Sequence, residues 1–387
     1  MPGHVEYIHP LHNLAMISYD PKLIGETPVR AATFKPQELQ SGETIWVTGL
    51  RADGKVQSRS ATVASVDPVE YPLSRTLRFR EANLETVSLV NGPDDYDGVI
   101  VNKNGEVMAS WASFAYEADR EIVQENRGVP AELVVEMLRH VREQRALQSL
   151  EAELQPIPLA SASKLGLSAK WVSRIADHSP ERRQVLSVSR LVGGAPAEKL
   201  LRSGDLILSI DGTVVNRFRE VERAVQKPSV RVTVLRNGAE QAIEVPTVAL
   251  EGTAVDRIVV WAGAVLQKPH RALAAQRGIE PSGVFVAYFS YGSPSTRYQL
   301  WAGRRIVEVD GQPTPDLDAF IRAVSGREDG TSLRLRTLTW NGSVEVITLK
   351  LDNQYWPMYE LRRTAEGWKR IGPGASGESS PQEAAGS

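Results

Sequence analysis

Three histidines near the start of the chain are the first residues whose type could do chemistry, because imidazole is a common ligand of Zn²⁺. They are His4, His9 and His12. Their spacing of five and three residues does not place all three on one face of a helix, and no nearby acid completes a ligand set. We therefore interpret them as turn or surface residues, and the sequence predicts neither a metal nor a cofactor.

A second group, Asp94, Asp95 and Asp97, carries carboxylates of the kind that bind Ca²⁺. Their order lacks the spacing of an EF-hand loop, so a solvated loop is the better interpretation. The chain has no cysteine, which excludes disulfides and a cysteine nucleophile. It also lacks the phosphate loop, the dinucleotide fingerprint and the Gly-x-Ser-x-Gly elbow. None of these groups therefore predicts a catalytic or metal centre.

A string of residues that occurs twice in the second half of the chain is more informative. Each copy has Gly-x-Pro, a short amphipathic stretch, and then a Gly placed seven residues before the Asp of an Asp-Gly pair. The copies start at Gly194 and Gly292, about a hundred residues apart, which is too far for a solenoid repeat. The alternating apolar residues favour a strand with one buried face, and Asp-Gly favours a tight turn. We therefore predict two similar domains in tandem.

The front part of the chain has a different pattern. Residues 1 to about 128 contain short β segments separated by Gly and Asn turns, as is typical of a sandwich or barrel. A helix is expected to follow Pro130, and a later row of leucines could extend it to Pro156. Its apolar residues recur at three- and four-residue spacing: Leu133, Val134, Met137, Leu138, Val141, Leu147, Leu150 and Leu154.

Composition limits the function classes further. The 387 residues are enough for two or three domains, and the net charge of −2 gives no basic field for nucleic acid or an anionic membrane. No apolar run approaches the length of a transmembrane helix, and no secretory signal is visible at the start. We therefore expect no nucleic-acid partner and no transmembrane segment, and the compartment stays open.

The repeat resembles a PDZ domain of the kind carried by HtrA/Deg proteases. This resemblance implies that each copy binds an extended peptide as an added strand, with the peptide carboxylate in a loop of backbone N–H groups and its side chains against a helix. The loops would be 165–167 and 261–264, and a purely core role for the helix residues remains the alternative. The predicted peptide-binding residues are Leu165, Gly166, Leu167, Phe218, Val221, Val225, Trp261, Gly263, Phe320, Ile321 and Val324.

The front part resembles the second β-barrel of a trypsin-like HtrA protease with its closing helix, on the segments 12–17, 98–107 and 128–130. Asn13 stands where that family has its catalytic Asp, and an amide cannot stabilise a histidine cation as a carboxylate does. Tyr96 stands at the nucleophile position, or Asp97 if the loop is shifted. At the oxyanion loop, the charge of Asp97 would oppose a developing oxyanion. The barrel that carries the catalytic His is missing, so the resemblance implies a pseudoprotease.

Further motifs extend the resemblance over residues 4–371 to the C-terminal half of the long HtrA/Deg proteases. They include His9-Pro10-Leu11-His12-Asn13, the run Arg78–Glu85 and Tyr355-Trp356-Pro357. We predict a mainly β fold with short helices, in which a partial trypsin-like barrel precedes two PDZ domains. The expected boundaries are 1–142 for the degenerate barrel and its helix, 143–158 for a helical linker, 159–250 and 251–371 for the PDZ domains, and 372–387 for a disordered tail.

The expected function is a non-catalytic region that binds peptide or unfolded-protein segments in protein quality control. It would form a homo-oligomer or associate with an HtrA/Deg protease. One alternative is a part of a serine endopeptidase whose catalytic domain lies upstream or on another chain, and another is a structural role with closed PDZ grooves. The missing barrel indicates that Met1 is not the natural start of the domain. The family implies a periplasmic or other extracytoplasmic location.

Overall fold

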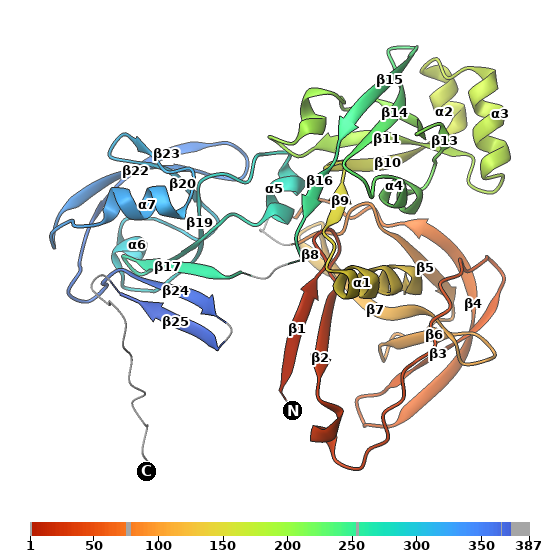
Figure 1. Cartoon of the computed structure of the whole chain (residues 1–387), viewed down its shortest axis with the longest axis horizontal. Helices are drawn as coiled ribbons and strands as arrows, with labels where there is room; N and C mark the ends of the chain where they lie inside the picture. The colour runs from red at the N-terminus through yellow and green to blue at the C-terminus, as the bar shows by residue number, and fades with distance from the viewer. Residues whose placement is uncertain (1, 75–78, 253–254, 365, 373–387) are drawn as a thin grey trace. The chain divides into compact units, whose positions relative to one another are not determined.

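The computed structural model describes residues 2–74, 79–252, 255–364 and 366–372, and Figure 1 shows their course. The chain divides into two compact units, Met1–Ala254 and Val255–Ser387. Strands dominate both units. Within the described residues, no helix has the length and apolar character needed to cross a membrane. The expected disordered tail lies outside the described residues except for residue 372.

A closed barrel of six strands, in the order β3-β4-β5-β8-β7-β6, forms the front of the first unit. Its strands are β3 (Thr44–Leu50), β4 (Val56–Pro68), β5 (Glu85–Val90), β6 (Gly98–Val101), β7 (Val107–Ala118) and β8 (Glu121–Pro130). Alternate residues such as Ile45 and Val47 fill its core, together with Ile100 and Trp111. The single barrel agrees with the sequence-based expectation.

The N-terminal segment lies outside that barrel. β1 (Gly3–Ile8) and β2 (Ala15–Tyr19) form a separate two-stranded hairpin, and η1 (Pro21–Ile24) follows it. Most of the segment 12–17, which carried the resemblance to the trypsin-like barrel, is therefore part of this hairpin and its turn. The turn between β1 and β2 carries His9, His12 and Asn13.

The helix after the barrel, α1 (Ala131–Glu143), begins after Pro130 as expected but ends earlier. Gln144 has a left-handed φ of 51°, and its N–H donates to the carbonyls of His140 and Val141. The chain then forms two strands, β9 (Leu147–Ser149) and β10 (Ala152–Pro158). The prediction of a helical linker over 143–158 was therefore wrong. Leucines 147, 150 and 154 fit a helical period, but 150 and 154 pack into the core of the next sheet.

That sheet has the order β10-β11-β12-β14-β15, with β13 paired to β12. β12 contributes Ile207 to one apolar cluster, with α4, and Leu206 and Leu208 to another, with α2 and α3, so both faces of the sheet are covered. The other strands are β11 (Gln184–Leu191), β12 (Leu206–Ile210), β13 (Thr213–Val214), β14 (Ser229–Arg236), β15 (Ala239–Pro246) and β16 (Val248–Leu250), which pairs with β9. The helices are α2 (Leu159–Lys164), α3 (Ala169–His178), η2 (Pro196–Lys199) and α4 (Phe218–Ala224).

The second unit has the strand order β23-β22-β20-β19-β18-β17-β24-β25, with β21 paired to β20. Its strands are β17 (Arg257–Trp261), β18 (Ala264–Gln267), β19 (Val284–Phe289), β20 (Arg305–Val309), β21 (Gln312–Pro313), β22 (Ser332–Leu338), β23 (Val344–Lys350), β24 (Tyr359–Thr364) and β25 (Gly367–Ile371). Its helices are α5 (Arg271–Arg277), α6 (Pro294–Arg297) and α7 (Leu317–Val324).

The two copies of the repeat have the same topology. The path β18-β19-β20-β22-β23 in the second unit matches β10-β11-β12-β14-β15 in the first. The Asp-Gly pairs form equivalent turns, with φ of 50° at Asp211 and 49° at Asp310. Each Asp Oδ1 also accepts a backbone N–H, from Arg231 at 3.0 Å and from Arg334 at 2.8 Å. The tandem PDZ architecture expected from the repeat is therefore present.

Candidate functional site

The positions that would carry serine-protease chemistry lie in different surroundings. Tyr96 is 5% exposed in the barrel core, and its hydroxyl donates to the backbone carbonyl of Val47 at 3.1 Å. Asp97 is exposed, and its Oδ1 accepts from the side chain of Asn126 at 3.4 Å. Asn13 is an exposed residue of the turn between β1 and β2. Tyr96, Asp97 and Asn13 therefore do not form a nucleophile paired with a base.

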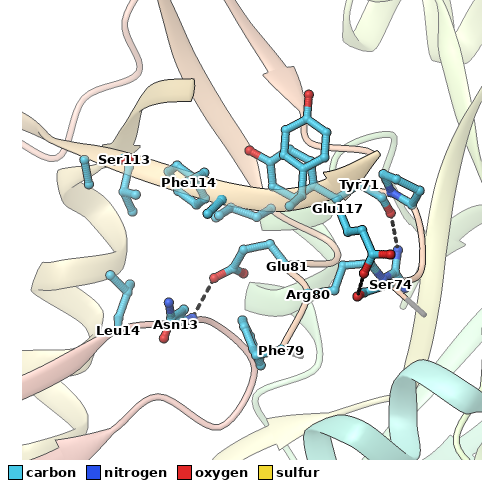
Figure 2. A pocket seen from close by; sticks show the side chains of 16 residues that line it. Asn13, Leu14, Tyr71, Ser74, Phe79, Arg80, Glu81, Ser113, Phe114 and Glu117 are labelled. Atoms are coloured by element: carbon cyan, nitrogen blue, oxygen red, sulfur yellow. Dashed lines mark hydrogen bonds between the residues drawn. The ribbon is translucent and has the colours of Figure 1, made fainter. Parts of the chain in front are cut away.

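Asn13 borders a small pocket of about 130 Å³ in the first unit, shown in Figure 2. Its wall mixes aromatic, aliphatic and charged side chains, and the rings of Tyr71 and Tyr116 stack at 4.5 Å. Burial and the neighbouring Glu125 raise the pKa of the Tyr71 phenol. Glu81, which points into the pocket, accepts the backbone N–H of Asn13 at 2.6 Å. The carboxylate beside Asn13 is therefore already committed to a structural bond.

His12 joins this region to the first PDZ domain. Its Nδ1 donates to Glu81 at 3.2 Å and its Nε2 donates to Glu222 on α4 at 2.9 Å. Both nitrogens can donate only in the imidazolium form. Burial lowers the pKa of His12, but the two carboxylates outweigh burial and raise it to about 9. Burial also raises the pKa of Glu222, while Arg219 and His12 bring it down to about 2. A buried, charged contact therefore fixes the β1–β2 turn to α4.

His9 contributes to the same turn without taking a charge. Its Nδ1 accepts the backbone N–H of Leu11 at 3.2 Å and that of His12 at 3.0 Å. Burial and the nearby His12 cation lower the pKa of His9 to about 3. The interpretation of these histidines as surface residues was wrong for His9 and His12, while a turn position was correct.

Arginines of the first PDZ domain face acids of the barrel and its closing helix. Arg217, which precedes α4, donates to Glu85 at 3.0 Å, and Glu85 is only 1% exposed. Arg182 donates to Glu38 at 3.2 Å. Arg219 on α4 is 4% exposed and pairs with Glu136 of α1. The contact between barrel and first PDZ domain is therefore built from matched charges, several of them removed from water.

The edge strand of the first PDZ sheet also receives a side chain from the barrel. Asn83 Nδ2 donates to the carbonyl of Ala152 at 2.8 Å, and its Oδ1 accepts the N–H of Leu154 at 2.8 Å. Next to it, Arg80 forms two 2.8 Å bonds with the carboxylate of Glu153. The three partners, Ala152, Glu153 and Leu154, all belong to β10. The outward side of this edge strand is thus bonded to residues 80–83.

The predicted carboxylate loop of the first copy has another role. Leu165, Gly166 and Leu167 turn the chain from α2 to α3, and their N–H groups donate to the carbonyls of Ala162 and Ser163 at 3.0–3.1 Å. Leu167 packs with α2 and α3, whereas α4 packs in the other cluster of the sheet. This loop assignment was wrong, because the N–H groups close the end of a helix.

The predicted groove residues on the helices belong to the two cores. Phe218, Val221 and Val225 are 2–5% exposed and pack under the first sheet. In the second unit, Phe320 and Val324 are buried, and Ile321 packs partly buried against the same cluster. The alternative noted from sequence, a core role, therefore describes these side chains in the structure.

The predicted loop of the second copy is a tight hairpin turn between β17 and β18. Ala262 and Gly263 have φ of 50° and 80°, and a Cβ on Gly263 would lie 2.1 Å from Cβ of Ser293. Trp261 is buried and meets the ring of Phe320 edge-on at 5.2 Å. β17 pairs along β18, so the side of β18 that is comparable to the outward side of β10 is already filled by the chain itself.

Sequence reasoning did not single out Glu81, Asn83, Glu85 or Glu222. Glu81, Asn83 and Glu85 have partners 68 to 132 residues away, and Glu222 meets His12 across 210 residues, so no local spacing marks these contacts. The only signal was the run Arg78–Glu85, which was noted as a family motif without a structural role.

Comparison with known proteins places these features in a wider context. A family model described as a PDZ-like domain matches residues 253–329. Protease Do-like 7 of Arabidopsis thaliana is 33% identical over 408 residues, which cover 96% of this chain and 37% of that protein. Pro-apoptotic serine protease nma111 of Aspergillus terreus is 32% identical over 384 residues, covering 95% of this chain and 37% of that protein.

Among solved structures, the HtrA-type protease AlgW with tripeptide is similar with a TM-score of 0.43 and 16% identity, over 63% of this chain and 76% of that chain. The chain thus spans about 37% of the length of the curated relatives above.

Proposed function

Because this chain belongs to the HtrA/Deg-type protease family, we propose that it works as a non-catalytic regulatory and assembly region of such a protease. The observation that carries this proposal is the position of Tyr96. At the place of the family's nucleophile, its ring fills the barrel core and its hydroxyl is bonded to the carbonyl of Val47. A nucleophile needs an adjacent base and open access to substrate, and neither is compatible with that position.

The carboxylate described beside Asn13 is not available to orient a catalytic histidine, because structural bonds already occupy it. Asn13 replaces the Asp, and the nearest described carboxylate bonded to it, Glu81, accepts its backbone N–H and a proton of His12. Loss of a nucleophile alone costs about 10⁶ in turnover. The barrel therefore serves as a scaffold in this proposal.

Peptide recognition is assigned to the first PDZ domain. Its β10 is the last strand of the sheet, and α4 belongs to the same domain, as a strand-addition site requires. In the second unit, β18 has β17 on one side and β19 on the other, so it cannot accept a further strand. We therefore assign extended or C-terminal peptide segments of client proteins to β10, and association with other chains to the rest of the surface.

Hydrolysis of fluorescein-labelled β-casein tests the non-catalytic part. The intact chain and a Tyr96→Phe variant, which keeps the ring and lacks the hydroxyl, are incubated with the substrate at 37 °C. We expect no release of fluorescent fragments by either protein. Hydrolysis by the purified chain that is lost in Tyr96→Phe would overturn the proposal.

A second candidate is a non-catalytic part of a longer serine endopeptidase. The observation that favours it is that the relatives are named as proteases and that the chain covers 37% of their length. An antibody against this sequence would be used to recover the native protein, followed by labelling with a fluorophosphonate. A labelled chain that contains this sequence and is heavier than 42.5 kDa supports this candidate. An unlabelled chain of 42.5 kDa contradicts it.

A further inference from the structure

The segment Glu81–Glu85 lies between the two elements of the first PDZ domain that would hold a peptide. On one side, Asn83 bonds to β10. On the other side, Glu85 pairs with Arg217 at the start of α4, and Glu81 reaches Glu222 of α4 through His12. A segment from the barrel, remote in sequence, thus connects the edge strand with the helix.

Asn83 bonds to β10 as an added strand would. An added strand offers an N–H and a C=O to alternate residues of the edge, and the Asn83 amide offers its Nδ2–H to the carbonyl of Ala152 and its Oδ1 to the N–H of Leu154. Both distances are 2.8 Å, which is typical of well-formed hydrogen bonds. The left-handed backbone at Asn83, with φ of 54°, is one that asparagine tolerates better than most residues.

Several further contacts fix this segment in place. Leu84 is 1% exposed and packs in an apolar cluster of the barrel with Leu133 of α1. Glu85 is equally buried, and its carboxylate accepts from Nε and Nη2 of Arg217 at 3.2 and 3.0 Å. The segment is therefore anchored by its apolar residue on the barrel side and by its charges on the PDZ side.

We propose that Glu81–Glu85 is an internal ligand of the first PDZ domain, which an incoming peptide must displace from β10. This inference rests on the proposed function, because it concerns regulation of the same peptide edge. The apparent affinity for a peptide is then the intrinsic affinity reduced by the fraction of molecules in which the segment is detached. Barrel and peptide compete for one strand, so peptide binding and loosening of the barrel contact are coupled.

A matched pair of variants isolates the Asn83 amide. Asn83→Gly removes both bonds to β10 and relieves the left-handed backbone. Asn91→Gly makes the same change at an exposed asparagine with φ of 59°. Each of the two hydrogen bonds makes a small net contribution to stability. Losing both corresponds to a roughly tenfold increase in the fraction of molecules in which the segment is detached from β10.

The first readout is hydrogen–deuterium exchange of the intact chain. We expect the amide of Leu154, which donates to Asn83, to exchange about tenfold faster in Asn83→Gly and to be unchanged in Asn91→Gly. Equal exchange in the wild type and both variants would overturn the internal ligand.

The second readout is binding of the intact chain to an array of peptides with free and amidated C-termini. We expect roughly tenfold tighter binding by Asn83→Gly than by the wild type, with Asn91→Gly equal to the wild type. Equal binding by all three proteins would overturn the competition. Faster exchange without peptide binding by any variant would instead contradict peptide capture, and so the proposed function, while supporting closure of the edge.

Discussion

Replacing Glu222 with glutamine removes the carboxylate that His12 and Arg219 share between the β1–β2 turn and α4. The side chain of Glu222 is 13% exposed, and its pKa is about 2 in the folded protein against 4.5 for an ordinary glutamate. Burial raises the pKa of Glu222, but the lowering by Arg219 and His12 is larger than this effect. Since a tenfold change in an acid constant corresponds to about 1.4 kcal/mol, the carboxylate contributes on the order of 3 kcal/mol to folding.

The sign of this contribution follows from the lowered pKa. The stabilisation is present above pH 4.5 and is lost as the pH falls towards 2. We therefore expect Glu222→Gln to lose about 3 kcal/mol at pH 7, which also agrees with the cost of breaking a buried ion pair. Urea denaturation, monitored through hydrogen exchange of the amides of residues 218–224, measures this loss of stability in the first unit.

The control is Glu244→Gln, the same change in an exposed pair. Glu244 lies 3.8 Å from Arg231, with side chains 61% and 70% exposed. Such a pair contributes less than about 1 kcal/mol. Equal stability losses in the two variants would refute the argument that His12, Glu222 and Arg219 form a buried, charged contact.

The pH profile of the first unit follows from two histidines, and three variants test other parts of the structure. Burial and His12 lower the pKa of His9 to about 3, so the stability that neutral His9 contributes is lost as the pH drops from 6.5 towards 3. Against the effect of burial, Glu222 and Glu81 raise the pKa of His12 to about 9, so the stability that the His12 cation contributes is lost as the pH rises from 6.5 to 9. Thermal melting from pH 4 to 10 should peak near 6.5, and a steady rise across that range would contradict the assignment. Tyr96→Ser should cost about 3–5 kcal/mol in melting experiments and create no fluorophosphonate-reactive serine. Gly263→Ala should unfold the second unit, because the new Cβ would lie 2.1 Å from a side-chain carbon, whereas Gly292→Ala, with φ of 79° and open space, should cost about 1 kcal/mol. Equal melting temperatures for these two variants would count against the hairpin geometry.

The sequence was sufficient for features set by local chemistry. The Asp-Gly pairs require left-handed backbone, and both copies form the same turn at Asp211 and Asp310. The barrel strands and the start of α1 after Pro130 were also predictable, since alternation and proline position act within a few residues. The tandem arrangement follows from these signals together.

The sequence was misleading where one spacing fits two structures. Leu147, Leu150 and Leu154 continue a helical period, yet they lie on or beside β9 and β10, because pairing with β11 and β16 outweighs a weak helical preference. The string Leu165-Gly166-Leu167 resembles a peptide loop but closes the end of α2. Local composition cannot distinguish a loop of N–H groups open to a ligand from one bonded to a helix.

The contacts of Asn83 and His12 were not predictable, because they arise only when the barrel and the first PDZ domain meet. Asn83 lies 71 residues from Leu154, and His12 lies 210 residues from Glu222. The same residues in an isolated domain would be ordinary surface groups. Their role depends on tertiary structure alone.

The most direct test of the central claim, that this chain carries no protease site, is the intact mass of the purified chain after exposure to a fluorophosphonate. The account predicts an unchanged mass, because Tyr96 is a core residue and no described serine replaces it at that position. A stoichiometric adduct that disappears in a denatured control would contradict it.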